Sequence, residues 1–140
     1  MPLNVLIVDD SDVMRKVVKR VLGLSGFEIG SVLEAANGDE ALMVLVDTPI
    51  DLVLSDVNMP VMDGVELLKA MKAERRFADI PVIIISTEGR SERINEILGY
   101  GADGYITKPF KPEDIRRVIQ DALGVEADGT FVEEPEDSDF

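Results

Sequence analysis

The segment Leu52-Val53-Leu54-Ser55-Asp56 decides how the chain folds, because it is an apolar run of strand length that stops at a carboxylate. Three further apolar runs of strand length stop at a carboxylate, a hydroxyl or an amine: Val5-Leu6-Ile7-Val8-Asp9-Asp10, Val82-Ile83-Ile84-Ile85-Ser86 and Tyr105-Ile106-Thr107-Lys108. Nearly continuous apolar runs are typical of parallel strands covered by helices on both faces. The C-terminal ends of such strands lie along one edge of the sheet, where ligands bind. Acids, a hydroxyl and a lysine gathered there indicate a site for a cation and a phosphoryl group.

Helical segments separate these runs, so that strands and helices alternate five times. Five βα units with right-handed crossovers predict the α/β class: a doubly wound, five-stranded parallel sheet in a three-layer αβα sandwich. The expected strands are at about 4–9, 28–34, 51–55, from Pro81 onward and 104–107, and the expected helices are at about 11–22, from Asn37 onward, 64–74, around Ile94 and from Pro112 to Gly124.

The helices show apolar residues at helical spacing. In the first helix these include Val13, Val17 and Val21, and in the second they include Ala41, Leu42, Leu45 and Val46. Ile94, Ile97 and Leu98 are expected on the inner face of the fourth helix. Asp63 and Glu66 predict a capping box at the start of the third.

Composition narrows the class of protein. The chain has 140 residues, about right for one domain, and it contains no cysteine and no histidine. No apolar run approaches the ~20 residues of a membrane span, and the N-terminus does not resemble a signal peptide. These features fit a cytoplasmic protein. They exclude a disulfide framework, a Ser-His-Asp triad and a histidine-ligated zinc. A phosphohistidine in the same pathway would belong to another protein.

The net charge of −14 argues against nonspecific nucleic-acid binding, which relies on basic side chains. The acidic residues are unevenly distributed along the chain: residues 125–140 hold seven acids and no base. We therefore expect one domain at 1–124 and an acidic C-terminal tail at 125–140. The tail is expected to be a solvating segment, or to be anchored through Phe131 and Phe140. It is too short for a DNA-binding output domain, so we expect output through protein contact.

The acids at the strand ends predict a metal site. Asp9 and Asp10 follow the first strand and Asp56 ends the third, and these strands are neighbours in the expected fold. Clustered carboxylates repel one another, a divalent cation relieves that repulsion, and hard oxygen ligands suit Mg²⁺. Asp56 is also placed as a nucleophile that could form an aspartyl phosphate, with Ser86 and Lys108 covering phosphoryl oxygens.

These motifs, in this order and spacing, resemble the receiver domain of the two-component response regulators, in particular its single-domain, chemotaxis (CheY-like) members. The similarity covers about residues 3–123, and the motifs that carry it are Val8-Asp9-Asp10-Ser11, Ser55-Asp56-Val57-Asn58-Met59-Pro60, Asp63-Gly64, Ser86, Gly101-Ala102-Asp103-Gly104-Tyr105 and Lys108-Pro109-Phe110. The resemblance implies a flavodoxin-like sheet with strand order 2-1-3-4-5.

The resemblance also implies a role for each matching residue. Asp56 would be the phosphoacceptor and would ligate Mg²⁺ with Asp10 and the Asn58 carbonyl, while Asp9 would act mainly through a metal-bound water. Lys108 would contact the phosphoryl group. Ser86 would be the switch hydroxyl, and Tyr105 the aromatic that turns inward in response. Thr87 offers a second hydroxyl beside Ser86, but Ser86 ends the strand at the family's usual distance before the lysine.

Further expectations concern rate and partners. Asn58 and Glu88 would tune self-dephosphorylation, and this pair resembles the chemotaxis type, which implies a short-lived signal. The first helix carries Arg15, Lys16, Lys19 and Arg20, which would dock a histidine kinase or histidine phosphotransfer protein. A downstream protein would bind the face formed by the fourth helix, fifth strand and fifth helix. The protein is expected to be a stand-alone, monomeric signalling module that catalyses only its own phosphorylation and dephosphorylation.

Three other interpretations remain open. The chain could be a phosphorelay intermediate rather than a chemotaxis regulator. It could be a phosphorylation-independent receiver scaffold, although its complete set of acids, hydroxyl and lysine argues against that. An FMN-binding electron carrier would need a phosphate loop after the first strand, where Asp9 and Asp10 would repel phosphate in the absence of a metal.

Overall fold

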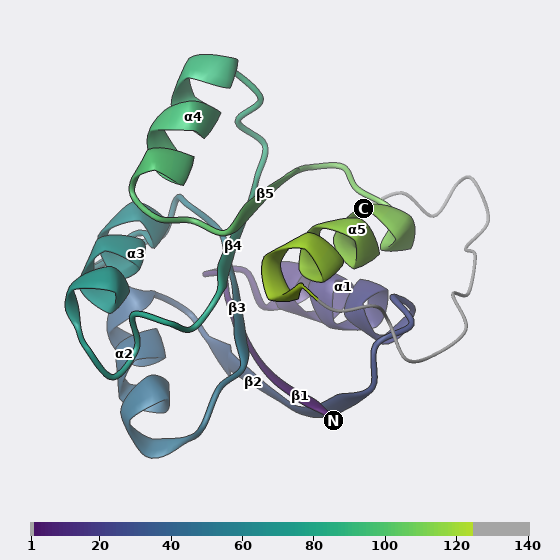
Figure 1. Cartoon of the computed structure of the whole chain (residues 1–140), viewed down its shortest axis with the longest axis horizontal. Helices are drawn as coiled ribbons and strands as arrows, with labels where there is room; N and C mark the ends of the chain where they lie inside the picture. The colour runs from purple at the N-terminus through teal and green to yellow at the C-terminus, as the bar shows by residue number, and fades with distance from the viewer. Residues whose placement is uncertain (1, 125–140) are drawn as a thin grey trace.

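The computed structural model describes residues 2–124, and the acidic segment 125–140 lies outside the described residues. Strands and helices alternate along the chain as the sequence predicts (Figure 1). The elements are β1 (Leu3–Val8), α1 (Asp12–Gly23), β2 (Ile29–Ala35), α2 (Gly38–Asp47), β3 (Leu52–Ser55), α3 (Gly64–Ala73), β4 (Val82–Ser86), α4 (Ser91–Gly99), β5 (Gly104–Thr107) and α5 (Pro112–Leu123). None of the helices among residues 2–124 is both long and apolar enough to cross a membrane.

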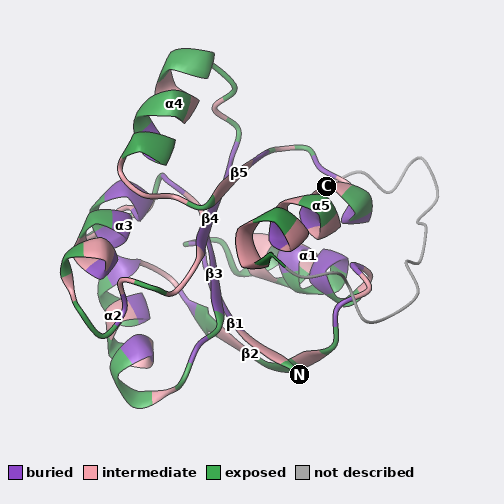
Figure 2. Ribbon diagram, viewed as in Figure 1, coloured by how far each residue is buried: buried purple, intermediate pink, exposed green. Residues whose placement is uncertain are grey.

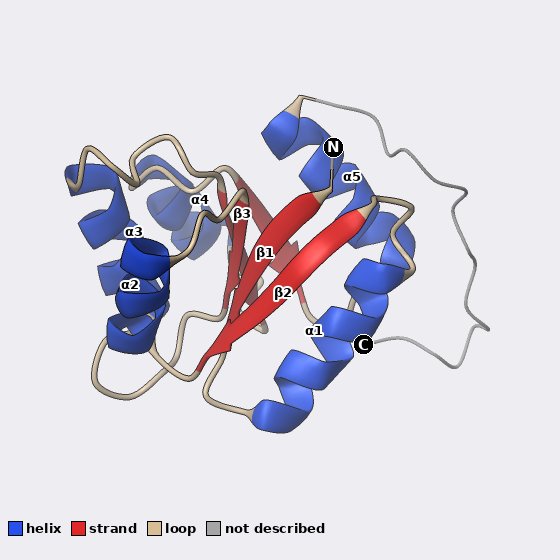
Figure 3. Ribbon diagram, turned by 90° about the horizontal axis from the view of Figure 1, so that it is seen from below, coloured by secondary structure: helices blue, strands red, loops and turns tan. Residues whose placement is uncertain are grey.

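The strands form one parallel sheet in the order β2-β1-β3-β4-β5, which confirms the predicted flavodoxin-like topology. Helices α1 and α5 cover one face of the sheet, and α2, α3 and α4 cover the other (Figures 1 and 3). The chain order reverses beside β1, so β1 and β3 are direct neighbours with Val8 opposite Ser55. This reversal is the place where ligands bind in open α/β sheets.

Two apolar clusters hold the layers together, one on each face of the sheet. Strands β3 and β4 are buried along their whole length, which is why they contain almost no polar residue before their last position (Figure 2). The α2–α3 face is closed by Leu67, Leu68 and Met71, and the α1–α5 face by Leu22 and Phe110. This burial fixes the strands in register and therefore fixes the residues that follow them.

Side chains set the helix starts close to where the sequence places them. Asn37 accepts the Glu40 backbone N–H at the start of α2. Asp63 and Glu66 form the predicted capping box at the start of α3, with each side chain accepting the other residue's backbone N–H. Strand β4 begins at Val82, one residue after Pro81, because proline lacks the N–H that a ladder requires.

Some expected core positions face solvent instead. Leu98 was expected on the inner face of α4, but it is exposed, and Ile97 is the only buried residue of that helix. Neighbouring helical residues point about 100° apart, so a narrow contact stripe on Ile97 leaves Leu98 outside it. Val13 in α1 and Val46 in α2 are exposed for the same reason, at the margins of their apolar stripes.

Candidate functional site

The polar residues that follow the strands converge at one edge of the sheet. Asp9 and Asp10 follow β1, Asp56 follows β3 and Lys108 follows β5, while Ser86 is the last residue of β4. The pairing of β1 with β3, of β3 with β4 and of β4 with β5 brings these ends side by side in space. The Asp56 backbone N–H donates to the Val8 carbonyl at 2.9 Å, which ties the two acidic strand ends together.

Three carboxylates form a compact cluster at this edge. Asp9, Asp10 and Asp56 each offer an oxygen, and these oxygens all lie within 4.8 Å of one another. Asp9 is buried, Asp56 is half-buried and Asp10 is exposed. Close like charges are costly without a compensating cation. An all-oxygen set that opens to solvent on one side fits Mg²⁺, which keeps several of its own waters.

The environment of Asp9 opposes its negative charge. Burial raises the pKa of the Asp9 carboxyl, and the nearby Asp56 and Asp10 carboxylates raise it further. The Ser11 backbone N–H, which donates to Asp9 Oδ1 at 2.9 Å, and the Lys108 ammonium lower the pKa and offset part of this effect. The acid cluster is therefore held together by the fold against its own repulsion.

Lys108 lies between two of the acids. Its Nζ is 3.7 Å from Asp9 Oδ2 and 3.8 Å from Asp56 Oδ1. The side chain is mostly buried, so it is not an ordinary solvated lysine. The backbone N–H of Lys108 donates to the Ser86 carbonyl at 2.8 Å, which holds the lysine beside the end of β4. The ammonium therefore places a positive charge beside the carboxylates of both acids.

The position of Asp56 depends on a close approach by α3. A Cβ built on Gly64, the first residue of α3, would lie 2.1 Å from the Asp56 carbonyl oxygen. The Gly64 N–H donates to the Val57 carbonyl at 2.8 Å, and the Val57 N–H donates to Asp56 Oδ1 at 2.8 Å. Glycine is therefore required at Gly64 for the loop to fold back on the acid.

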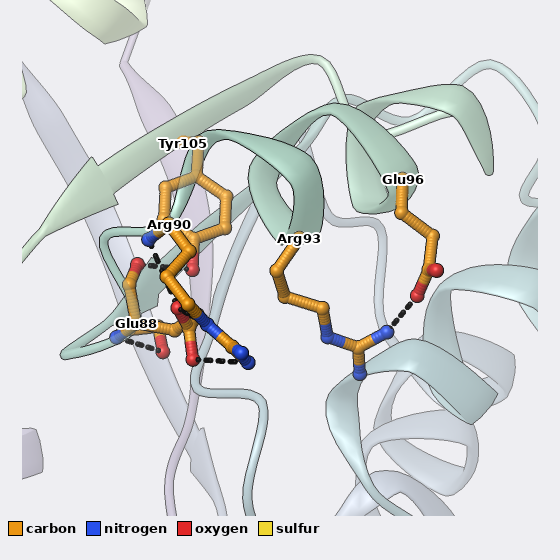
Figure 4. Close-up of polar contacts among 6 residues, drawn as sticks. Glu88, Arg90, Arg93, Glu96 and Tyr105 are labelled. Carbon is orange, nitrogen blue, oxygen red and sulfur yellow. Dashed lines mark hydrogen bonds and ion pairs between the residues drawn. The ribbon is translucent and has the colours of Figure 1, made fainter.

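A network of hydrogen bonds ties the β4–α4 loop to β5. The Glu88 N–H donates to Ser86 Oγ at 3.1 Å, and the Tyr105 hydroxyl donates to the Glu88 carbonyl at 2.8 Å. The Glu88 carboxylate accepts from Arg90 Nε at 2.8 Å and from Nη2 at 3.2 Å, and hydrogen bonds from Arg90 lower the pKa of Glu88. Figure 4 shows Glu88, Arg90 and Tyr105 close together, to one side of the helix that carries Arg93 and Glu96.

The remaining candidates differ in their surroundings. Ser86 is buried and Thr87 is exposed, so Ser86 is the hydroxyl enclosed at the strand end. Asn58 is exposed on the loop after Asp56. On α1, Lys16, Lys19 and Arg20 are exposed.

Arg15 differs from the other basic residues of α1 because its side chain is mostly enclosed. Its Nε donates to Glu34 Oε1 at 2.8 Å, and its Nη1 donates to the Asp9 backbone carbonyl at 2.6 Å. Sequence reasoning placed Arg15 only on a docking face and missed these contacts. The sequence feature that could have indicated these contacts is Glu34, an acid near the end of β2 that can pair with a basic residue of α1.

Comparisons with known proteins agree with this geometry. The family model for the response regulator receiver domain matches residues 5–120. A chemotaxis protein CheY homolog of Campylobacter jejuni is 37% identical over 123 residues, covering 87% of this chain and 93% of that protein. The solved chemotaxis response regulator CheY4 of Vibrio cholerae has a TM-score of 0.77 and 37% identity, covering 88% of this chain and 100% of its own. A chain of the solved CheX–CheY–BeF3–Mg²⁺ complex of Borrelia burgdorferi has a TM-score of 0.77 and 31% identity, covering 88% of this chain and 90% of its own.

Proposed function

The chain belongs to the response regulator receiver family, and from this premise we propose that Asp56 accepts a phosphoryl group from a phosphohistidine on a partner protein. The single observation that carries the proposal is the convergence of Asp9, Asp10 and Asp56 within 4.8 Å, with Lys108 beside them. Asp56 is partly exposed and lies beside Lys108, so an incoming phosphorus can reach it.

The transfer is an in-line displacement. A carboxylate oxygen of Asp56 attacks the phosphorus of the phosphohistidine, and the new P–O bond forms as the P–N bond breaks. The imidazole nitrogen leaves with the bonding electron pair and takes up a proton from solvent. In such reactions, catalysis consists mainly of positioning and of neutralising the equatorial oxygens. Lys108 supplies one cationic contact, and the Ser86 hydroxyl can donate a hydrogen bond to another oxygen.

The acid cluster fits a resident Mg²⁺. The carboxylates of Asp10 and Asp56 and the Asn58 backbone carbonyl would hold it, with Asp9 acting through a water. When bound, the ion neutralises negative charge on the acids and on the phosphoryl oxygens. The fit rests on the donor set, which contains only oxygens gathered from two adjacent strand ends.

Phosphorylation would change the conformation of the β4–α4 loop. A Ser86 hydroxyl drawn toward the phosphoryl oxygens would no longer accept the Glu88 N–H, which now donates to it at 3.1 Å. Tyr105 is half-buried, and its hydroxyl donates a hydrogen bond to the Glu88 carbonyl. A rearrangement of Glu88 would therefore remove a contact that holds the Tyr105 ring in place. The change would alter the face made by α4, β5 and α5, and a downstream protein would recognise that face.

The signal would end by hydrolysis of the aspartyl phosphate. Water attacks the phosphorus, the P–O bond to Asp56 breaks, and the products are the Asp56 carboxylate and inorganic phosphate. Asn58 and Glu88 flank the route of that water and would set its rate. A phosphorylated state that persists for hours in Mg²⁺ without a phosphatase would contradict the short lifetime proposed for this chain.

Several of the relatives that match this chain are chemotaxis proteins, so we favour a chemotaxis-type output. The phosphoryl donor would be a histidine kinase, or a histidine phosphotransfer protein, that docks on the exposed basic residues of α1. The Borrelia burgdorferi relative is solved in complex with CheX, and a comparable protein is a candidate partner for the phosphorylated form of this chain.

The decisive experiment is incubation with acetyl phosphate and Mg²⁺, followed by intact-mass measurement. We expect one phosphoryl adduct on the native protein, none on Asp56→Asn, and none when the metal is chelated. Asp12→Asn is the matched control, because Asp12 is an exposed acid at the start of α1 outside the cluster, and it should be phosphorylated normally. Absence of an adduct on the native protein, or an unchanged adduct on Asp56→Asn, would refute the proposal.

A further inference from the structure

Arg15 makes two contacts that are unusual for a basic residue on a helix face. Its guanidinium reaches both the Asp9 carbonyl, just beyond β1, and the Glu34 carboxylate on β2. The Arg15 side chain is 17% exposed, and that of Glu34 is 39% exposed. One side chain therefore joins α1, the loop that carries the acids, and the neighbouring strand.

The Asp9 carbonyl is a sensitive point in the acid cluster. It belongs to the peptide unit that links Asp9 to Asp10, and a peptide unit is a rigid plane. The Asp9 N–H belongs to the preceding peptide unit, and it donates to the Ala35 carbonyl of β2 at 3.0 Å. Hydrogen bonds therefore hold the peptide units on both sides of the Asp9 Cα, the Val8–Asp9 unit through its N–H and the Asp9–Asp10 unit through its carbonyl. These bonds restrict the backbone from which the two carboxylates project.

Arginine suits this bridging position better than lysine does. Its guanidinium is planar, stays charged and offers several donors in a rigid arrangement, so it can satisfy two acceptors that lie in different directions. Glu34 holds the guanidinium through an ion pair, and its strand position opposite Ile7 of β1 is set by the sheet register. The ion pair with Glu34 therefore orients the group that binds the Asp9 carbonyl.

We propose that Arg15, oriented by Glu34, is a positioning residue that fixes the Asp9–Asp10 peptide and so sets the affinity of the acid cluster for Mg²⁺. The inference rests on the proposed function, because it concerns the metal of the same site. In this role Arg15 acts through the backbone carbonyl of Asp9 rather than through the carboxylates that would hold the metal. The role differs from kinase docking, since it affects phosphorylation by any donor.

The test measures Mg²⁺ affinity by titration calorimetry on Arg15→Met, Arg15→Lys, Glu34→Gln and wild type. Removal of a group that orients metal ligands typically weakens metal binding about 10- to 100-fold. We expect Mg²⁺ binding to be about 10-fold weaker in Arg15→Met, and to be weakened less in Arg15→Lys and Glu34→Gln. The rate of phosphorylation by acetyl phosphate at subsaturating Mg²⁺ should fall in parallel and recover at saturating Mg²⁺.

The matched control is Arg75→Met, the same chemical change at an exposed arginine beyond the end of α3. Helix α3 begins at the site and runs away from it for 10 residues, about 15 Å, so Arg75 is remote from the acids. Arg75→Met should bind Mg²⁺ as wild type does. Thermal melting in a chelator separates the two roles, because a merely structural Arg15 would lower the melting temperature and leave the Mg²⁺ affinity of the folded protein unchanged.

Unchanged Mg²⁺ affinity in Arg15→Met would overturn the inference, as would an equal loss in Arg75→Met. If Arg15→Met does not fold, the Mg²⁺ affinity of Glu34→Gln provides the test, and an unchanged affinity in that variant would overturn the inference. Failure of the proposed function gives a different result, in which the wild type itself neither binds Mg²⁺ nor takes up a phosphoryl group.

Discussion

At the scale of single residues, the site combines features that oppose folding with features that serve chemistry. Asp9 is 5% exposed and lies beside two other carboxylates, and its raised pKa shows that its charged form is disfavoured there. Lys108 compensates for this only in part, because its ammonium is 3.7 Å from the Asp9 carboxylate. The fold therefore maintains a cluster of acids whose repulsion a bound cation would relieve.

The first prediction concerns the cost of that cluster. Asp9→Asn keeps the shape and the oxygen that accepts the Ser11 N–H, but it removes one charge. We expect the free energy of unfolding in a chelator to rise, because the variant removes a charge that burial and the neighbouring carboxylates disfavour. Urea denaturation with and without Mg²⁺ measures this.

Addition of Mg²⁺ should stabilise the wild type more than Asp9→Asn, because the variant has lost part of the charge that attracts the ion. A variant that is less stable than wild type in the chelator would show that Asp9 does not carry the repulsion.

The second prediction concerns Tyr105. Its hydroxyl donates to the Glu88 carbonyl, so Tyr105→Phe leaves that carbonyl without this donor. We expect a loss of about 1 kcal/mol in the free energy of unfolding. We also expect faster amide hydrogen exchange at Glu88, whose N–H now donates to Ser86 Oγ. Tyr100→Phe is the matched control and should leave exchange at Glu88 unchanged. Equal exchange in Tyr105→Phe and wild type would contradict a role for the hydroxyl in holding the loop.

At the scale of elements, the site depends on how closely α3 approaches the loop after β3. Gly64 lies so near Asp56 that any side chain at this position would overlap the Asp56 carbonyl oxygen. The capping box of Asp63 and Glu66 fixes the start of the helix, so α3 cannot easily slide along its axis to make room. A shift of helix α3 would therefore displace Asp56, and a shift of Asp56 would displace the helix.

The third prediction tests this coupling. Gly64→Ala should destabilise the fold by about 1–3 kcal/mol through overpacking, and it should slow phosphorylation of the fraction that folds because Asp56 is displaced. Gly23→Ala is the matched control, since a Cβ there meets nothing within 4 Å. It should be neutral or slightly stabilising. Wild-type phosphorylation kinetics in folded Gly64→Ala would refute the displacement of Asp56.

The elements also show what the sequence could and could not predict. Strand ends were predictable because β3 and β4 are buried on both faces and change to polar residues only where they end. The roles of Leu98 and Arg15 were not, because both depend on distances between elements. Leu98 required knowledge of how narrowly α4 packs, and Arg15 required knowledge that α1 lies beside Glu34 and the Asp9 carbonyl.

At the scale of the whole molecule, charge is distributed in a way that favours a directed encounter. The chain has a net charge of −14, yet α1 presents Lys16, Lys19 and Arg20 on its exposed side. A basic surface on an acidic protein restricts the orientations in which an acidic partner approaches, and such complementarity acts chiefly on association rates. Helix α1 starts just after Asp9 and Asp10, so a partner docked there would lie close to the acid cluster.

The fourth prediction separates docking on α1 from chemistry at Asp56. Lys19→Glu should slow phosphotransfer from a phosphorylated kinase about tenfold at low salt, and the difference should shrink as added salt screens the charges. Phosphorylation by acetyl phosphate should stay at the wild-type rate, because Lys19 makes no contact with the acid cluster. Arg75→Glu changes the net charge by the same amount at the far end of α3, so it controls for a general effect of charge.

Arg15 is unsuitable for this docking test, because its replacement would disturb the Asp9–Asp10 peptide. Phosphorylation by the kinase and phosphorylation by acetyl phosphate would then both be slower. The comparison therefore uses both donors for every variant, and the ratio of the two rates is the quantity that reports docking. Lys19→Glu should change this ratio, Arg15→Met should lower both rates at subsaturating Mg²⁺, and Arg75→Glu should change neither. If Lys19→Glu lowered the rates of phosphorylation by the kinase and by acetyl phosphate equally, α1 would contribute to the chemistry of the site rather than to recognition of the kinase.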